Sequence, residues 1–158
     1  RLTEKGEFAS RIYADEILLG EIFSTNFYKD LNEYQILLLL ACICFESGDR
    51  AVIKGRAPSQ FIKPIKRKIW SDRFLQREKR FNFLDKMAIF IHPCYHGASI
   101  FELLKNTDLL EGDMIRFFRQ ILDRISQVKK ATPNRRLAEM LNNCKHLIID
   151  CLKDIDTV

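Results

Sequence analysis

A run of ten apolar residues, Ile36–Phe45, constrains the fold of this 158-residue chain more than any other feature. Four consecutive leucines followed by Ala41 favour a helix over a buried strand. A helix that is apolar on nearly every side must be enclosed by other elements, so it belongs at the centre of the core. Asn32 and Gln35 stand three residues apart ahead of the run and predict a capping box at its start. The run is too short to span a bilayer, and we expect no contact with a membrane.

Composition favours further helices around this centre. The chain is 47% hydrophobic and 30% charged, and it has only six glycines and four prolines, which favours helices over a sandwich or barrel. Helical spacing of apolar residues recurs in five other segments: residues 8–23, 71–92, 99–105, 112–128 and 133–155. We therefore predict an all-α helical bundle that forms a single domain over residues 1–158. The chain begins with Arg1, so we expect it to be a fragment of a longer protein.

The boundaries of these segments carry their own signals. Residues 1–6 are expected to be the tail of a preceding element that turns at Gly6. Asp15 and Glu16 are expected to open a second helical segment, since acids favour the first turn of a helix. Pro93 should kink or end the helix that precedes it. Thr132 followed by Pro133 predicts the start of the last helix.

Residues 97–128 predict a short helix, a polar turn and a long amphipathic helix. The short helix is expected to be capped by Ser99, with Glu102 as the reciprocal partner. The long helix should run from about Gly112 to Val128, roughly 25 Å at the standard rise. One broad face of it is apolar and is expected to be buried; its residues are Met114, Ile115, Phe118, Ile121, Leu122, Ile125 and Val128.

Polar side chains form a ladder on the other face of this long helix. Arg116, Gln120, Asp123 and Gln127 follow one another at intervals of four, three and four residues, and Arg119 flanks them. Such a ladder can offer hydrogen-bond donors to the bases or phosphates of an extended strand, and guanidinium planes stack on bases. The same pattern is also typical of a helix whose polar face is simply in water.

The order of short helix, turn and long helix also resembles a helix-turn-helix, in which the long helix would enter the major groove of DNA. Asp108, Glu111 and Asp113 argue against this alternative, because acids at the start of the helix would repel phosphates. The helix is also long for one that reads DNA bases.

Positive charge is concentrated between residues 50 and 80. This segment holds eleven Lys or Arg against two acids, whereas the whole chain carries a net charge of +5. A concentrated basic segment favours polyanions, and we predict nucleic-acid contacts at Lys66, Arg67 and Lys68. Residues 48–70 contain two Gly and two Pro and show no clean period, which predicts a long basic loop. A solvated loop without a partner is the alternative.

Cysteine and histidine do not indicate catalysis or a metal site. Five cysteines, mostly with apolar neighbours, predict free buried thiols in a reducing, intracellular compartment. His92, Cys94 and His96 are three potential zinc ligands, but a proline separates them and no fourth ligand is obvious, so we predict no metal site. The sequence contains no phosphate loop and no nucleophile elbow, and we expect no catalytic site in this fragment.

Four segments, taken in order, form a recognisable pattern: LTEKGEFAS, DEILLGEIF, LNEYQILLLLACICFE and GASIFELLKNTDLLEGDMIRFFRQILDRISQV. The pattern resembles the C-terminal helical domain of superkiller-type DExH-box RNA helicases, the DSHCT domain. The specific part of the match, G-x-S-x-x-E-[IL]-x-x-x-T-D-x-x-E-G-x-x-I-R, falls on Gly97, Ser99, Glu102, Leu103, Thr107, Asp108, Glu111, Gly112, Ile115 and Arg116.

The resemblance implies that the parent protein is an ATP-dependent 3′-to-5′ RNA helicase that acts in RNA processing or decay. It implies that RecA-like motor domains of the same chain bind ATP and Mg²⁺, and that this domain braces them without a cofactor of its own. It also implies that residues 112–128 are the ratchet helix beside the unwound single-stranded RNA. RNA-decay proteins are implied as partners.

The ladder and the resemblance together predict nucleic-acid contacts at Arg116, Arg119, Gln120 and Asp123. Some members of the family carry an Arg where Gln120 stands and a Glu near the position of Asp123, so Gln120 keeps hydrogen bonding and loses charge. The alternatives are a purely structural or protein-docking helical domain and a helix-turn-helix DNA-binding module.

Overall fold

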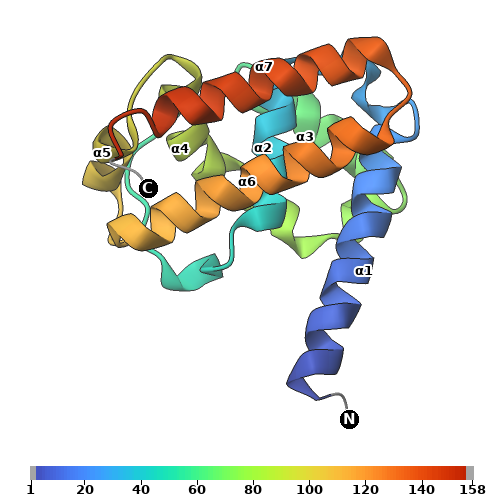
Figure 1. Ribbon diagram of the computed structural model, residues 1–158, viewed down its shortest axis with the longest axis horizontal. Coiled ribbons are helices and arrows are strands. Elements are labelled where there is room, and N and C mark those ends of the chain that lie inside the picture. The colour runs from blue at the N-terminus through green and yellow to red at the C-terminus, as the bar shows by residue number, and fades with distance from the viewer. Residues whose placement is uncertain (1–2, 156–158) are drawn as a thin grey trace.

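Helices account for the regular structure of the computed structural model, which describes residues 3–155 (Figure 1). The α-helices are α1 Glu4–Phe23, α2 Glu33–Cys44, α3 Ile62–Ser71, α4 Leu84–Tyr95, α5 Ile100–Leu103, α6 Glu111–Ala131 and α7 Arg135–Cys151. The 3-10 turns are η1 Phe27–Asp30, η2 Gly48–Arg50, η3 Leu75–Arg77, η4 Lys79–Phe83 and η5 Leu104–Asn106. Across residues 3–155, the strand-like pairing is limited to an isolated bridge between Ile53 and Thr107. The predicted all-α helical bundle is therefore confirmed.

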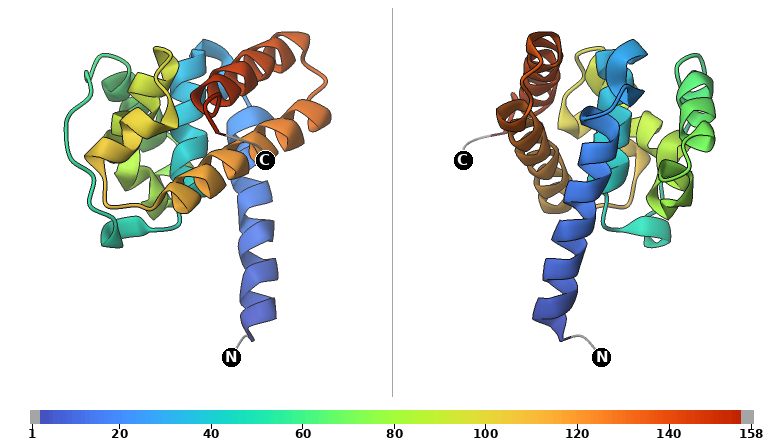
Figure 2. Two further views of the ribbon diagram at one scale, coloured as in Figure 1. Left: turned by 60° about the vertical axis from the view of Figure 1, so that its left-hand side comes forward. Right: turned by 90° about the vertical axis from the view of Figure 1, so that its right-hand side faces the viewer.

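Helix α2 lies at the centre of the bundle (Figures 1 and 2). Residues 36–42 have no exposed surface, and α4, α6 and α7 pack around them. The side chain of Asn32 accepts a hydrogen bond from the backbone N–H of Gln35 at 2.9 Å, and Gln35 Oε1 accepts one from Asn32 N–H at 3.0 Å. The capping box and the central position of this helix are both confirmed.

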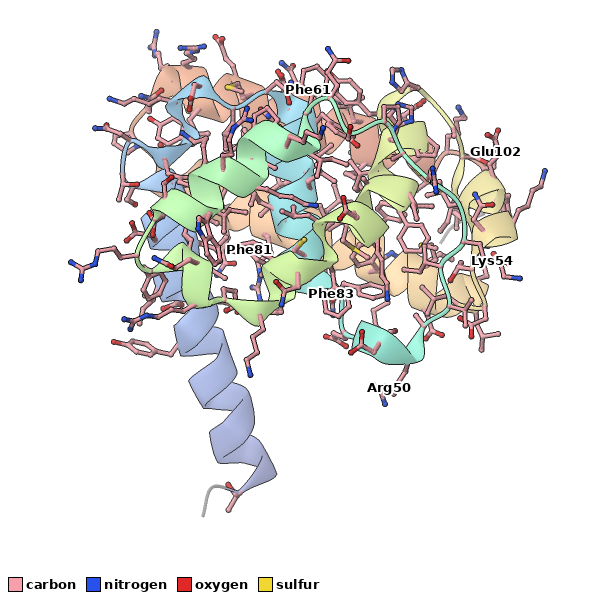
Figure 3. All side chains as sticks on the ribbon, turned by 180° about the vertical axis from the view of Figure 1, so that it is seen from behind. Arg50, Lys54, Phe61, Phe81, Phe83 and Glu102 are labelled. Carbon is pink, nitrogen blue, oxygen red and sulfur yellow. The ribbon has the colours of Figure 1, made fainter. Side chains whose placement is uncertain are left out.

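Two groups of elements cover opposite sides of α2. Helices α6 and α7 form an antiparallel pair on one side, in front of α2 in Figure 1. Helix α3 lies on the other side with η3 and η4, as the right-hand view of Figure 2 and the back view in Figure 3 show. The central layer therefore separates α6 from α3.

Helix α1 is continuous, and its N-terminal half extends beyond the other helices (Figures 1 and 2). Thr3 caps it, because its Oγ1 accepts a hydrogen bond from the N–H of Gly6 at 3.1 Å. The predicted turn at Gly6 is therefore wrong, and so is the predicted helix start at Asp15, which lies inside α1. A lone glycine is tolerated within a helix, at a modest cost in free energy.

The predicted basic loop over residues 48–70 is wrong for its second half, which is helical in α3. Pro64 is the third residue of α3, where a backbone N–H would have no helical partner, so the proline does not prevent the helix. The inner face of α3 buries Ile62, Ile65 and Ile69. Basic residues surround these three isoleucines in the sequence, so their helical spacing was not recognised.

The long helix predicted between residues 71 and 93 is only half present, because α4 begins at Leu84. The side chain of Asp72 accepts hydrogen bonds from the N–H groups of Phe74 and Leu75, at 2.9 and 2.8 Å. Such side-chain bonds compete with a continuing helix and start a new turn instead. The segment between α3 and α4 therefore forms η3 and η4.

Two predicted helix caps also differ from the structure. Ser99 precedes α5, but its side chain makes no capping hydrogen bond. The cap of α7 is Asn134, whose side chain accepts a hydrogen bond from Leu137 N–H at 3.0 Å, and not Thr132. Thr and Asn both cap helices well, and Asn134 is the residue that directly precedes the first residue of α7, Arg135.

All five cysteines are free and buried, as predicted. Within residues 3–155, no helix combines the length and the apolar character needed to cross a membrane.

Candidate nucleic-acid interface

Helix α6 contains the predicted long amphipathic segment and continues three residues beyond Val128. Its buried residues are Met114, Phe117, Phe118, Ile121, Ile125 and Val128. Ile115 and Leu122, which the sequence assigns to the same face, are only half-buried. The apolar back of α6 is therefore confirmed, and its centre is shifted toward Phe117.

Phe117 is a core residue that the sequence analysis missed. Its ring lies 5.6 Å from that of Phe45 at 81° and 6.3 Å from that of Phe90, both measured between ring centroids. Edge-on aromatic contacts of this kind add to the free energy of burial. The signal was available, because Phe117 lies three residues after Met114 and four before Ile121.

Thr107 and Asp108 fix the turn that leads into α6. Asp108 Oδ1 accepts a hydrogen bond from Val52 N–H at 2.8 Å, and Val52 O accepts one from Asp108 N–H at 3.2 Å. Thr107 Oγ1 accepts a hydrogen bond from Leu109 N–H at 3.2 Å. This part of the motif thus fastens the loop after η2 to the start of α6.

We use the name outer strip for the polar side chains of α6 that the sequence singles out, namely Arg116, Arg119, Gln120 and Asp123. Arg119 and Asp123 are exposed. Arg116 is also exposed and pairs with Asp113 one turn earlier, at 3.0 Å. Gln120 is half-buried, and its Nε2 donates to Glu46 Oε1 at 3.1 Å. The outer strip therefore faces solvent, with two of its members held by neighbouring carboxylates.

A buried carboxylate joins α6 to α1, and the sequence analysis missed it. Asp15 is only 5% exposed. Its Oδ2 accepts a hydrogen bond from Arg124 of α6 at 3.0 Å, and its Oδ1 accepts one from Arg80 of η4 at 2.8 Å. Arg124 also donates to Gln127 at 3.1 Å. Asp15 lies three residues before Leu18 and seven before Ile22, so its place on the buried face of α1 was readable in the spacing.

Arg80 is held by two acids in this cluster. Its guanidinium donates to Glu78 at 3.1 Å and to the backbone oxygen of Ile43 at 3.1 Å, besides its bond to Asp15. Burial alone would lower the pKa of Arg80, but the hydrogen bonds that it donates to Glu78 and Asp15 outweigh this effect and raise the pKa. Burial alone would raise the pKa of Glu78, but the hydrogen bonds that it accepts from Arg80 outweigh this effect, so its pKa is lowered. Arg80 and Glu78 are therefore both charged at neutral pH.

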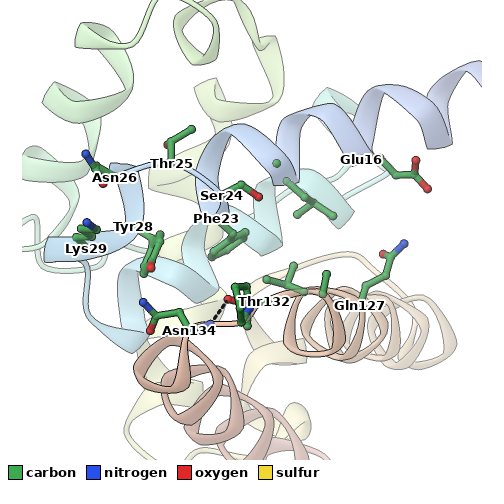
Figure 4. Close-up of a pocket in the computed structure, with 15 residues that line it drawn as sticks. Glu16, Phe23, Ser24, Thr25, Asn26, Tyr28, Lys29, Gln127, Thr132 and Asn134 are labelled. Atoms are coloured by element: carbon green, nitrogen blue, oxygen red, sulfur yellow. Dashed lines mark hydrogen bonds between the residues drawn. The ribbon is translucent and has the colours of Figure 1, made fainter.

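A groove of about 720 Å³ lies where the C-terminal end of α6 meets α1 (Figure 4). Gln127 of the predicted ladder lines it from α6, and Phe23 and Tyr28 line it from the end of α1 and from η1. Thr132 and Asn134, joined by a hydrogen bond of 3.1 Å, close one side. Gln127, the last residue of the predicted ladder, therefore borders a partly apolar groove.

The basic residues Lys66, Arg67 and Lys68 lie on α3, on the opposite side of α2 from the outer strip (Figures 2 and 3). Lys66 pairs with Asp85 at 2.7 Å, and Lys68 pairs with Asp30 at 2.6 Å. The structure therefore does not bring the two predicted groups of nucleic-acid contacts together.

The residues of the His-Pro-Cys-Tyr-His segment do not converge on one point. The rings of His92 and His96 lie 4.5 Å apart, whereas Cys94 is buried and its thiol donates to the backbone oxygen of Leu147 at 3.6 Å. Burial and the neighbouring His96 lower the pKa of His92. In the part of the chain that the structure describes, no group of three or more His, Cys, Asp or Glu could hold a metal ion.

A model of the DSHCT (NUC185) domain family matches residues 1–150 of this chain. Similar proteins include the ATP-dependent RNA helicase mtr4 of Schizosaccharomyces pombe, which is 29% identical over 139 residues. The exosome RNA helicases MTR4 of Mus musculus and Homo sapiens are each 26% identical over 149 residues.

These alignments cover 80% of this chain for the Schizosaccharomyces pombe protein and 84% for the two mammalian proteins. They cover only 12% and 14% of the helicases themselves, so this chain spans about one seventh of their length or less. No solved structure matches the chain.

Proposed function

Since this chain belongs to the DSHCT (NUC185) domain family, we propose that it is the C-terminal accessory domain of an ATP-dependent RNA helicase and that α6 lies along the unwound single-stranded RNA. In this role the domain braces the motor domains of the helicase during RNA processing or decay inside the cell. The names of the similar proteins, which are ATP-dependent and exosome RNA helicases, support the proposal.

The two-sided character of α6 is the observation that carries this proposal. Its back is fixed by buried apolar side chains, while Arg116, Arg119 and Asp123 of the outer strip are exposed over the same turns and Gln120 is half-buried. A rigid helix that presents the donors Arg116, Arg119 and Gln120 on neighbouring turns can hold a flexible strand without rearranging, which limits the entropy lost on binding.

The partners of the outer strip leave it free to bind RNA. The ion pair between Arg116 and Asp113 is exposed, and pairs of this kind stabilise a protein by only about 0.2–1 kcal/mol. A phosphate can therefore replace Asp113 as the partner of Arg116 at little cost. Arg119 has no ion pair to a residue that the structure describes, so its guanidinium can stack on a base or bind a phosphate.

ATP and Mg²⁺ belong to the motor domains of the helicase in this proposal. The sequence has no phosphate-loop motif, and the described residues form no group of metal ligands. The described residues of this chain therefore do not fit a site for a nucleotide and its metal ion. In this proposal the domain guides the RNA strand and braces the motor domains.

The test compares two double variants of the full-length protein that contains this chain. In Arg116→Ala with Gln120→Ala, we expect affinity for a labelled 20-nucleotide oligouridylate to fall about tenfold or more, because hydrogen bonds to charged groups are lost. Fluorescence anisotropy measures the affinity at fixed salt. The control is Arg136→Ala with Gln60→Ala, which removes one Arg and one Gln from exposed positions outside the strip.

Unchanged affinity in the first variant would refute the contact and leave a purely structural domain whose outer strip is only hydrated. Tighter binding to a duplex DNA than to the single strand would instead support the helix-turn-helix alternative.

A further inference from the structure

Trp70 is exposed at the end of α3 although it is the sole tryptophan of the chain. Its side chain is 75% exposed, and the neighbouring Phe74 is 43% exposed. Burial of an indole is favourable in free energy. An exposed indole beside a second exposed aromatic ring is therefore typical of a binding surface. Neither ring contributes to the buried inner face of α3.

Basic side chains share the exposed face of α3 with Trp70. Lys63, Lys66 and Arg67 precede it by seven, four and three residues, which are the spacings that place side chains on one side of a helix. Lys66 is paired with Asp85, but the guanidinium of Arg67 makes no hydrogen bond or ion pair to any residue in the described part of the chain. Its charge is therefore available to an anion.

A recess of about 570 Å³ adjoins this face, between the end of α3 and η4. Lys66, Arg67 and Trp70 line it on one side, and Phe81, labelled in Figure 3, lines it on the other. Glu78 is the acidic residue in its lining. The ion pair of 3.1 Å with Arg80 neutralises Glu78, so its carboxylate does not repel an anion.

We propose that this α3 surface, formed by Lys63, Lys66, Arg67, Trp70 and Phe74, binds a second stretch of single-stranded RNA, with a base stacked on Trp70 and phosphates held by Arg67 and Lys66. The choice of RNA as the ligand rests on the proposed function. The location of the site is independent of the proposed function, because α3 and the outer strip lie on opposite sides of α2 (Figure 2).

Charge and aromatic surface together favour RNA over a protein partner. From Lys63 to Arg77 the chain carries six Lys or Arg against one acid, Asp72. An unwound strand supplies phosphates for the cations and unstacked bases for the indole, and stacking tolerates any base sequence. An acidic peptide would satisfy the cations but not the aromatic platform.

The fluorescence of Trp70 reports on this site directly, because the chain has no other tryptophan. Titrating this chain with an octauridylate should quench the emission, since a base stacks on the indole. An octamer of abasic sugar-phosphate, which has the same charge, should bind about tenfold more weakly or worse. Equal quenching by the abasic strand or by octaglutamate would overturn the proposal, because either result removes any role for base stacking.

Variants separate this surface from the outer strip. Trp70→Ala should weaken anisotropy-detected binding of labelled octauridylate by about tenfold, and Arg67→Ala should reduce the slope of log affinity against log salt by about 0.7. Phe101→Ala, which removes an exposed aromatic ring from α5, is the matched control and should change neither value.

The variant Arg116→Ala with Gln120→Ala should retain full quenching of Trp70. If quenching disappears in that variant, the α3 surface is not a separate site. If Trp70 never responds to RNA while the full-length protein still loses affinity through the outer strip, the α3 surface is refuted and the proposed function stands.

Discussion

Asp15 joins α1 to α6 and to η4 through two ion pairs. Its nearly buried carboxylate accepts hydrogen bonds from Arg80 and Arg124, which come from different elements. Without the carboxylate, Arg80 keeps its ion pair with Glu78, whereas Arg124 keeps, among the described residues, only its hydrogen bond to Gln127. An unpaired buried charge costs far more free energy than an exposed pair gains.

We predict that Asp15→Asn lowers the free energy of unfolding by about 3 kcal/mol. Urea denaturation followed by circular dichroism measures the change. The control is Asp113→Asn, which makes the same chemical change in the exposed pair with Arg116 and should cost less than about 1 kcal/mol. Equal losses in the two variants would contradict the structural role of Asp15.

For single residues, the spacing in the sequence indicates which side chains are buried, but it does not indicate their hydrogen-bond partners. The spacing of Asp15 relative to Leu18 places it on the buried face of α1, but its partner Arg124 lies 109 residues away. A pair so distant along the chain is fixed by tertiary packing, which no local pattern encodes.

Helix starts show how closely local chemistry determines an element. Asn32 and Gln35 form the predicted capping box of α2, whereas Ser99 and Glu102 carry the same signature and Ser99 makes no side-chain capping bond. The two helices also differ in length, because α2 has 12 residues and α5 has 4 and is continued by η5.

We predict that Asn32→Ala lowers the free energy of unfolding by about 1 kcal/mol, since it removes the bond to Gln35 N–H. Ser99→Ala should cost less than half of that, because no capping bond is lost. Thermal and urea unfolding of both variants provide the comparison. A larger loss for Ser99→Ala would show that its hydroxyl caps α5 in solution.

Elements with a long apolar period are predictable from this sequence, and short elements are not. The helical spacing over residues 133–155 predicts α7, whose stripe Leu137, Leu141, Cys144, Ile148 and Cys151 is buried, although the helix ends at Cys151. Helix α3 was missed because its apolar stripe is only three residues long and Pro64 lies in its first turn. In that segment packing against the bundle decides the conformation, and local propensity does not.

On the scale of the whole molecule, the five buried thiols report on the integrity of the core. Burial raises the pKa of Cys44 to about 12, although Arg124 opposes the effect. At pH 8 only about one such thiol in ten thousand is a thiolate, and the thiolate is the reactive form.

We predict that the folded chain reacts slowly with a disulfide reagent at pH 8 and that reaction becomes fast across the urea unfolding transition. Ser126→Cys adds a thiol at an exposed position of α6 and should give one rapidly reacting equivalent under native conditions. Rapid reaction of the unaltered chain without urea would show that the core opens locally.

The arrangement of the two candidate RNA surfaces was not predictable from the sequence. Nucleic-acid contacts are predicted both at Lys66 to Lys68 and on the outer strip, yet α2 lies between the two groups. Charge along a chain does not show which side of a bundle it will occupy, because that depends on how the helices connect in space.

The shared carboxylate also gives the molecule a mechanical property. Asp15 lies eleven residues from the Glu4 end of α1, a lever arm of roughly 16 Å at the rise of an α-helix. A sideways force at that end exerts a torque about Asp15, and the ion pair with Arg124 passes it to α6 one turn beyond Gln120. A deflection at the Glu4 end of α1 is therefore borne by the ion pair between Asp15 and Arg124.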